Sequence, residues 1–158
     1  MLNKILMSCL LLLSFTAYAD NSIKPLQVGS ALPSIELNTQ HDKAVKVGND
    51  VKTILFAVDK APSGLINNFL IKKDAGFLVS KKAYFVADIS GMPSLITKMF
   101  AIPKMKKRAY DILLAKNATK VSFIPRKKGL VTVLKLAGGR VTSVDFVNNI
   151  DQLAKAIN

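Results

Sequence analysis

Two continuous apolar runs stand out along the chain, and each is followed by apolar residues at helical spacing. Residues 53–58 and 83–89 are almost free of polar side chains and are bounded by turn-forming residues, a pattern typical of parallel strands buried on both faces. Helices are expected to start near Pro62-Ser63 and near Pro93. This strand, helix, strand, helix order predicts an α/β fold with right-handed crossovers. The expected apolar faces of the two helices are Leu65, Ile66, Phe69 and Leu70, and then Leu95, Ile96, Met99, Phe100 and Ile102.

The two ends of this region carry weaker patterns. Ile35 and Leu37 alternate with polar neighbours, so a short first strand is expected within 28–37, with a possible second strand at 44–47. A last helix should begin after Asn148 or Asn149, because asparagine is a good N-cap residue. Its apolar face would consist of Ile150, Leu153, Ala154 and Ile157.

Between these parts the spacing of the apolar residues changes from a helical to a strand period, which predicts hairpins. Residues 110–115 and 120–124 flank a polar stretch and are expected to form a short hairpin. Residues 130–136 and 141–147 flank Gly138-Gly139, and paired glycines accept the positive φ angles of a tight hairpin turn. The chain is therefore expected to end in an antiparallel hairpin closed by a helix.

The first 19 residues have the pattern of a secretory signal peptide. Lys4 gives a short positive region, an apolar run follows, and Ala17-Tyr18-Ala19 is a small-x-small cleavage site. We therefore expect cleavage after Ala19, a lead at 20–27, one domain at 28–158, and a periplasmic or secreted product without a further transmembrane segment. Cys9 is the one cysteine of the chain, so the exported product would have no thiol and no disulfide.

Charge is strongly uneven along the chain. The 158 residues include 23 Lys and Arg against 10 Asp and Glu, a net charge of +13. Residues 104–140 contain eleven of these cations and a single acidic residue, Asp111. Such a field attracts anionic partners, and an anionic envelope component or an acidic protein is expected. Nucleic acid is not expected, because aromatic residues for base stacking are scarce. The candidate anion-binding residues are Lys104, Lys106, Lys107, Arg108, Arg126, Lys127 and Lys128.

Few residues suggest chemistry. His41 is the one histidine and lies in a polar turn, and the acidic residues are scattered singly, so neither a catalytic triad nor a metal site is indicated. Asp59 and Asp88 each end a predicted parallel strand, where open α/β sheets bind ligands, although aspartate also caps loops and helices there. The candidate small-ligand pocket consists of Asp59, Lys60, Pro62, Ser63 and Asp88.

The order of elements resembles the thioredoxin-like fold, and the opening Val28-Gly29-Ser30-Ala31-Leu32-Pro33 is similar to the lead-in of peroxiredoxin-type exported members. The resemblance implies a three-layer sandwich with a mixed central sheet flanked by helices. It also implies redox cysteines between the strand at 53–58 and the next helix, and a cis-proline, for which Pro103 and Pro125 are candidates. In this chain the cysteine position reads Asp59-Lys60-Ala61-Pro62-Ser63-Gly64. Without a thiolate there, thiol oxidoreductase and peroxidase chemistry are excluded.

The chain also resembles small exported bacterial proteins that carry the label of FAD/FMN-containing dehydrogenase. The glycine-rich turn that holds a pyrophosphate is absent, so no flavin or other cofactor is expected. Our leading hypothesis is a non-redox thioredoxin-like binding domain with a basic face for an anionic partner. The alternatives are an enzyme or small-molecule-binding protein that uses the 59–64 loop with Asp88, and a domain that recognises a thioredoxin-type protein.

Overall fold

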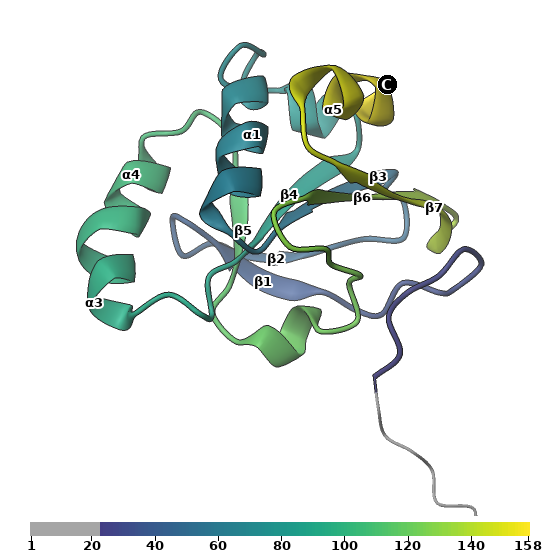
Figure 1. The fold of residues 1–158 in the computed structure, drawn as a ribbon, viewed down its shortest axis with the longest axis horizontal. Helices are drawn as coiled ribbons and strands as arrows, with labels where there is room; N and C mark the ends of the chain where they lie inside the picture. Colours follow the sequence, from purple (N-terminus) through teal and green to yellow (C-terminus); the bar gives the residue numbers. More distant parts are fainter. Residues whose placement is uncertain (1–22) are drawn as a thin grey trace, which may run out of the picture.

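The computed structural model describes residues 23–158 (Figure 1). The predicted signal peptide, its cleavage point after Ala19 and Cys9 lie outside the described residues. Seven strands form one mixed sheet in the order β2-β1-β5-β4-β3-β6-β7. The strands are β1 (Glu36–Thr39), β2 (Ala44–Lys46), β3 (Thr53–Ala57), β4 (Ala83–Asp88), β5 (Ile112–Ala115), β6 (Val131–Ala137) and β7 (Arg140–Val147).

The centre of the sheet confirms the two predicted buried strands. β4 pairs in parallel with β3, with Ala57 opposite Ala87, and every residue of β3 is buried. The predicted β6–β7 hairpin is also present, and its turn uses Gly138 (φ 55°) and Gly139 (φ 73°). Both angles lie in the left-handed region that favours glycine. The first strand begins later than the proline-rich lead suggested, at Glu36.

The hairpin predicted for 110–124 is wrong. Ile112–Ala115 is a buried strand, β5, that pairs in parallel with β4 and antiparallel with β1. Residues Ala118–Val121 form a 3-10 helix, η2, whose N-cap residue is Asn117. The Asn117 side chain accepts a hydrogen bond of 2.9 Å from the Thr119 amide, so the polar stretch starts a helical turn instead of closing a hairpin. The run of buried residues was the mark of a third parallel strand.

Helices cover the two faces of the sheet unequally. α1 (Lys60–Leu70), α2 (Phe77–Ser80) and α5 (Ile150–Ile157) pack on one face, above the sheet in Figure 1. The other face is covered by η2 and by the N-terminal segment 26–35. Asn149, the second of the two predicted caps, accepts a hydrogen bond of 2.9 Å from the Gln152 amide at the start of α5.

A continuous helical segment at 94–106 connects β4 to β5 and projects from one side of the molecule, at the left of Figure 1. It consists of α3 (Ser94–Ile96), the π-helical turn η1 (Thr97–Ala101) and α4 (Ile102–Lys106). The predicted apolar face is wrong in its orientation, since Leu95, Ile96, Met99 and Phe100 are exposed while Ile102 packs on the core.

The π turn gives the physical reason. It contains about one extra residue per turn, which rotates the turn that follows by about 100°. Ile102 is thereby moved away from the side that carries Leu95 and Phe100. Met92, Ile102 and Met105 are the side chains of this region that pack against the core.

Two further expectations concern the backbone. Every peptide bond of the described residues is trans, so neither Pro103 nor Pro125 is the cis-proline that the resemblance implied. Within residues 23–158, no helix combines the length and the apolar character needed to cross a bilayer.

Candidate functional site

Four residues of the predicted pocket lie directly after β3. The loop expected at 59–64 is wrong, because α1 begins at Lys60 and only Asp59 of these four residues precedes the helix. Asp59 is the N-cap residue of α1, but its side chain makes no capping hydrogen bond and is exposed. Lys60 is exposed, Ser63 is half-buried, and Pro62 is buried in the first helical turn, where amides lack intrahelical partners and a proline is tolerated. In the described part of the chain, neither Asp59 nor Lys60 has an oppositely charged group within 4.0 Å. The start of α1 therefore offers one carboxylate and one amine to solvent.

Asp88, the fifth pocket residue, is the last residue of β4 and its side chain is only 2% exposed. Its Oδ1 accepts hydrogen bonds from the amide of Ser90 (3.0 Å) and from the hydroxyl of Ser90 (2.6 Å). Its Oδ2 accepts a hydrogen bond from Nη1 of Arg126 at 3.1 Å. Both carboxylate oxygens are thus engaged by the protein, as a buried charge requires.

The Arg126 side chain lies across the carboxyl ends of β3 and β4. Besides its ion pair with Asp88, it donates from Nη2 to the carbonyl of Val121 at 2.9 Å. Its guanidinium carbon lies 5.2 Å from the ring centroid of Phe56 in β3, within the range of a cation–π contact. The side chain is 37% exposed. Arg126 therefore bridges β3, β4 and η2 while part of its side chain remains exposed to solvent.

The two halves of the predicted pocket face different sides of the sheet. Successive side chains of a strand point to opposite faces, so Asp88 shares a face with Val86. Val86 and Phe56 belong to the part of the core beneath η2, whereas α1 packs on the other face. The structure therefore brings Asp88 together with Arg126 and not with the start of α1 at Asp59.

The predicted basic residues form two groups at opposite ends of the sheet. Lys104 and Lys106 lie in the last turn of α4, with Lys107 and Arg108 directly after it. The chain then enters β5, where Ile112 lies opposite Phe85 near the amino end of β4, and Figure 1 shows α4 leading toward that end. Arg126 instead lies at the carboxyl end, beside Asp88. The two groups do not converge into one patch.

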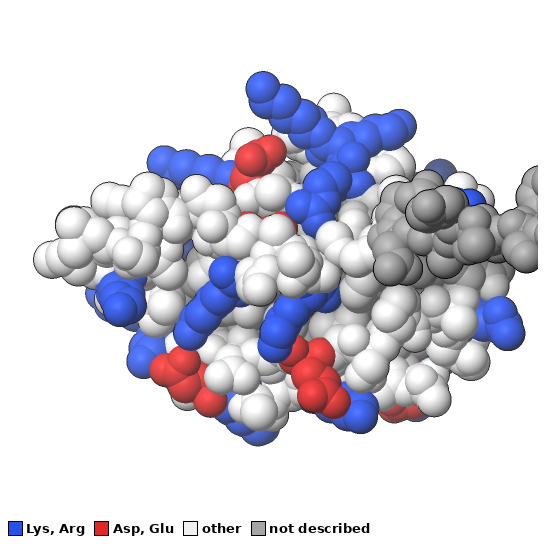
Figure 2. All heavy atoms as spheres, turned by 90° about the horizontal axis from the view of Figure 1, so that it is seen from below, with Lys and Arg blue, Asp and Glu red and all other residues white. Residues whose placement is uncertain are grey.

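The exposed cations differ in what surrounds them. Lys127 lies with Nζ 4.5 Å above the ring of Phe146, and Lys128 is exposed. Figure 2, the view from the side of η2, shows Lys and Arg side chains dispersed over this face with carboxylates between them. Cations in the last turn of α4 are also favoured by the negative end of the helix dipole, so part of their placement has a structural reason.

Tyr110 ends the basic segment and ties it to α1. Its hydroxyl donates a hydrogen bond of 2.6 Å to Oδ1 of Asn67. Burial raises the pKa of the Tyr110 phenol, and the nearby positive charge of Arg108 lowers it in part. The backbone carbonyl of Tyr110 accepts a hydrogen bond from the buried side chain of Gln40, so this corner is held firmly in place.

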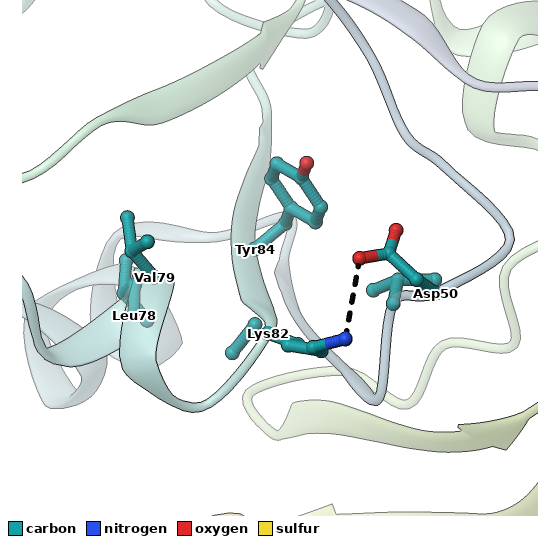
Figure 3. A pocket seen from close by; sticks show the side chains of 7 residues that line it. Asp50, Leu78, Val79, Lys82 and Tyr84 are labelled. Atoms are coloured by element: carbon teal, nitrogen blue, oxygen red, sulfur yellow. Dashed lines mark ion pairs between the residues drawn. The ribbon is translucent and has the colours of Figure 1, made fainter.

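Two hollows of the surface lie at the amino ends of the central strands. The one in Figure 3, about 170 Å³, is lined by Leu78, Val79 and Tyr84 beside an ion pair of 3.6 Å between Lys82 and Asp50. Both partners of this pair are more than half exposed, and exposed pairs contribute little. The hollow is small and lacks an arrangement of groups for catalysis.

A second hollow, about 490 Å³, gathers cations that are distant in the sequence. Lys52, Lys81 and Lys135 line it together with serine and threonine side chains. Burial lowers the pKa of Lys135, and the positive charge of Lys81 lowers it further. Sequence patterns did not indicate this grouping, because the three residues come from three separate elements.

The last sequence candidates to place are His41 and the acidic residues. His41 is exposed in the turn between β1 and β2, and the described residues contain no cluster of three or more His, Cys, Asp or Glu side chains suited to a metal ion. Besides the grouping of Lys52, Lys81 and Lys135, two features were not predicted from the sequence: the pairing of Asp88 with Arg126 and the exposed apolar side of 94–100. The sequence held one signal for the pairing of Asp88 with Arg126, since a carboxylate at the end of a buried strand requires a partner.

Comparisons with known proteins bear on the fold. No protein-family model and no curated protein sequence matches the chain. Among solved structures, a putative protein disulfide isomerase from Bacteroides thetaiotaomicron is similar over 84% of this chain and 86% of its own, with a TM-score of 0.59 and 14% identity. The thioredoxin domain of a thiol-disulfide oxidoreductase from Bacteroides vulgatus covers 84% and 99% at a TM-score of 0.55 and 14% identity.

A peroxidoxin from Mycobacterium tuberculosis gives the same TM-score of 0.55 and 14% identity over 84% of this chain and 94% of its own. At such identities the likeness concerns the fold. The chain has an α/β thioredoxin-like fold, with a mixed seven-stranded sheet and flanking helices, which confirms the predicted fold class.

Proposed function

We propose that this chain is an exported thioredoxin-like domain that acts by binding, without thiol redox chemistry, and that its basic residues face an anionic partner. The solved structures that share its fold are described as disulfide isomerases, thiol-disulfide oxidoreductases and peroxidoxins. Their descriptions concern thiol chemistry, so the first question is whether this chain has the groups for that chemistry.

The observation that carries the proposal is the sequence at the start of α1, directly after β3. Thiol exchange needs a thiolate nucleophile, and residues 59–64 read Asp59-Lys60-Ala61-Pro62-Ser63-Gly64. Residues 23–158 contain no cysteine, and Cys9 lies in the predicted signal peptide. At the neighbouring strand end, the Arg126 side chain lies over Phe56 and pairs with Asp88. These groups build a closed structural contact and supply no electron carrier.

Charge supports the second half of the proposal. Of the eleven cations between Lys104 and Arg140, Lys116 and Arg126 are those with a carboxylate within 4.0 Å in residues 23–158. The remaining nine, the group at 104–108 among them, have no carboxylate within 4.0 Å in these residues. Such a field raises the rate of encounter with anionic partners in a salt-dependent manner. In the predicted compartment these partners would be an anionic envelope component or an acidic protein.

The enzymatic alternative has less support from the geometry. Asp88 would have to present a carboxylate to a ligand, but its oxygens accept hydrogen bonds from Ser90 and Arg126. Asp59 is exposed and lies on the side of α1. An acid–base pair needs both groups within reach of one substrate, and these two carboxylates face different sides of the sheet.

The test is retention of the exported full chain on a heparin resin, eluted with increasing NaCl. The variant Lys106→Glu/Lys107→Glu is expected to elute at clearly lower salt than the original chain. The matched control Lys43→Glu/Lys72→Glu makes the same change of charge at two exposed lysines outside 104–140. Equal elution of the two variants would overturn the assignment of the anionic partner to this region.

A further inference from the structure

We infer that the helical segment 94–108 docks on the surface of an anionic phospholipid bilayer, with Leu95, Ile96, Met99 and Phe100 entering the interface. The inference rests on the proposed function, since it names the anionic partner. We call the four side chains the apolar ridge. It was predicted as a buried face, and the structure places it in solvent.

Exposure of the ridge is large for side chains of this kind. Leu95 is 64% exposed, Ile96 45%, Met99 60% and Phe100 63%. Their spacing by one and four residues places them on one side of the helix. Large apolar side chains gathered on a protruding element mark interaction sites more often than single exposed ones do.

The opposite side of the segment packs against the core, and this contact directs the ridge toward solvent. Ile102, Met105 and Met92 pack against the core. Thr97 is buried and donates a hydrogen bond of 3.1 Å from its hydroxyl to the carbonyl of Pro93. The π turn at Thr97–Ala101 turns the ridge and Ile102 in different directions. The helix therefore directs four apolar side chains outward while other side chains of the same region pack against the core.

Cations flank the ridge without any compensating acid. Lys98 lies within it, and Lys104, Lys106, Lys107 and Arg108 follow, while no Asp or Glu occurs between Asp88 and Asp111. No ion pair involves these five cations in the described part of the chain. Figure 2 shows the projection at its left as a largely uncharged surface with Lys and Arg at its margins.

This combination selects one occupant. A second copy of the chain would place the same five cations against one another, which charge repulsion opposes. An amphipathic helix with apolar side chains beside lysines is the form that lies in a membrane interface, where its apolar side enters by about 5–10 Å. Anionic lipid attracts clustered cations near the surface, and a protruding convex helix reaches a flat bilayer without requiring a groove.

The experiment measures binding of the exported full chain to vesicles of phosphatidylcholine with and without phosphatidylglycerol. Met99→Ser/Phe100→Ser is expected to weaken binding to the anionic vesicles about tenfold or more, since it removes most of the inserted apolar area. The matched control is Ile71→Ser/Val79→Ser, which changes two apolar residues of equal or greater exposure, 63% and 80%, on other elements. It should bind as the original chain does.

Fluorescence gives a direct reading of insertion. The chain has no tryptophan, so Phe100→Trp introduces a single indole on the ridge, and Val79→Trp does so at the control site. On anionic vesicles the emission of the first should shift to shorter wavelength and that of the second should not. Circular dichroism of each variant establishes that the fold is intact.

The outcomes separate the two proposals. Suppose that the chain binds heparin in a salt-dependent manner. Unchanged vesicle binding of Met99→Ser/Phe100→Ser, or an unshifted emission of the Phe100→Trp variant, would then overturn the membrane inference alone. An acidic protein would in that case be the partner that fits the charge. Failure to bind heparin and anionic vesicles alike would overturn the proposed function and the inference together.

Discussion

The contact between Asp88 and Arg126 allows a sharp prediction about stability, because an equally long ion pair elsewhere serves as its control. The N–O distance is 3.1 Å both in this pair and in the pair of Lys46 with Glu36. In the first pair the Asp88 side chain is 2% exposed, whereas both side chains of the second are at least 64% exposed. The distances are equal and the burial is unequal. Because Arg126 also contacts Phe56 and Val121, the two pairs are compared by their coupling energies, which exclude those contacts.

We expect Arg126→Met to lower the free energy of unfolding by about 2–3 kcal/mol. Removing one partner of a fully buried pair costs about 3–5 kcal/mol, and the partial exposure of Arg126 reduces this value because water reaches the remaining charge. Asp88→Asn should cost about 1–2 kcal/mol, since a solvated Arg126 is left with a neutral hydrogen-bond partner. The coupling energy from the double mutant should be about 1–2 kcal/mol.

The assay is equilibrium unfolding in urea, followed by circular dichroism, for the original chain, both single variants and the double variant. The denaturant slope should stay constant, so that midpoints report stability. The same cycle with Glu36→Gln and Lys46→Met should give a coupling of less than about 0.5 kcal/mol. Equal coupling in the two cycles, or additive effects of Asp88→Asn and Arg126→Met, would refute the reasoning from burial.

One further prediction follows from the missing thiol, and two follow from single hydrogen bonds. In an insulin-reduction assay with dithiothreitol the chain should leave the uncatalysed rate unchanged, because residues 23–158 have no thiol; faster precipitation would contradict this. Tyr110→Phe should cost about 1 kcal/mol through loss of the hydrogen bond to Asn67. Burial raises the pKa of Tyr110 above its ordinary 10.0, so the folded state favours the neutral phenol, and the contribution of Tyr110 to the free energy of unfolding is retained below pH 10 and lost above it. Urea midpoints measured on both sides of pH 10 should therefore fall less in Tyr110→Phe than in the original chain. An equal fall in both would contradict this prediction. Asn149→Ala should lower the free energy of unfolding by about 1 kcal/mol through loss of the α5 cap, as measured by thermal unfolding. An equal or larger effect of Asn148→Ala would contradict the assignment of this cap to Asn149.

The sequence predicted the parts of the fold that depend on local periodicity. The buried runs that became β3 and β4, the Gly138-Gly139 hairpin and the C-terminal helix needed only strand or helix spacing and turn residues. β5 lies within the strand predicted at 110–115, but its pairing was predicted wrongly, because a run of four buried residues beside a polar stretch is also the pattern of a hairpin arm. Pairing with β4 or with a neighbour in sequence is a tertiary choice that periodicity does not express.

The candidate site was less accessible to sequence reasoning for a related reason. Asp88 was identified as the end of a strand, but its side-chain direction and its partner Arg126, 38 residues away, depend on how η2 crosses the sheet. The apolar ridge was recognised as a face of a helix and assigned to the core. One extra residue in a π turn changed which side of that helix meets the sheet, and local hydrophobic periodicity does not mark such a turn.

Binding through 94–108 is tested most directly by a nuclear magnetic resonance titration of the isotope-labelled chain, without the predicted signal peptide, with phosphatidylglycerol bicelles. Amide shifts should concentrate in residues 94–108 and should diminish as NaCl is added. Shifts concentrated instead at residues 59–64 and Asp88, or no shifts at all, would contradict a binding domain with a basic surface for an anionic partner.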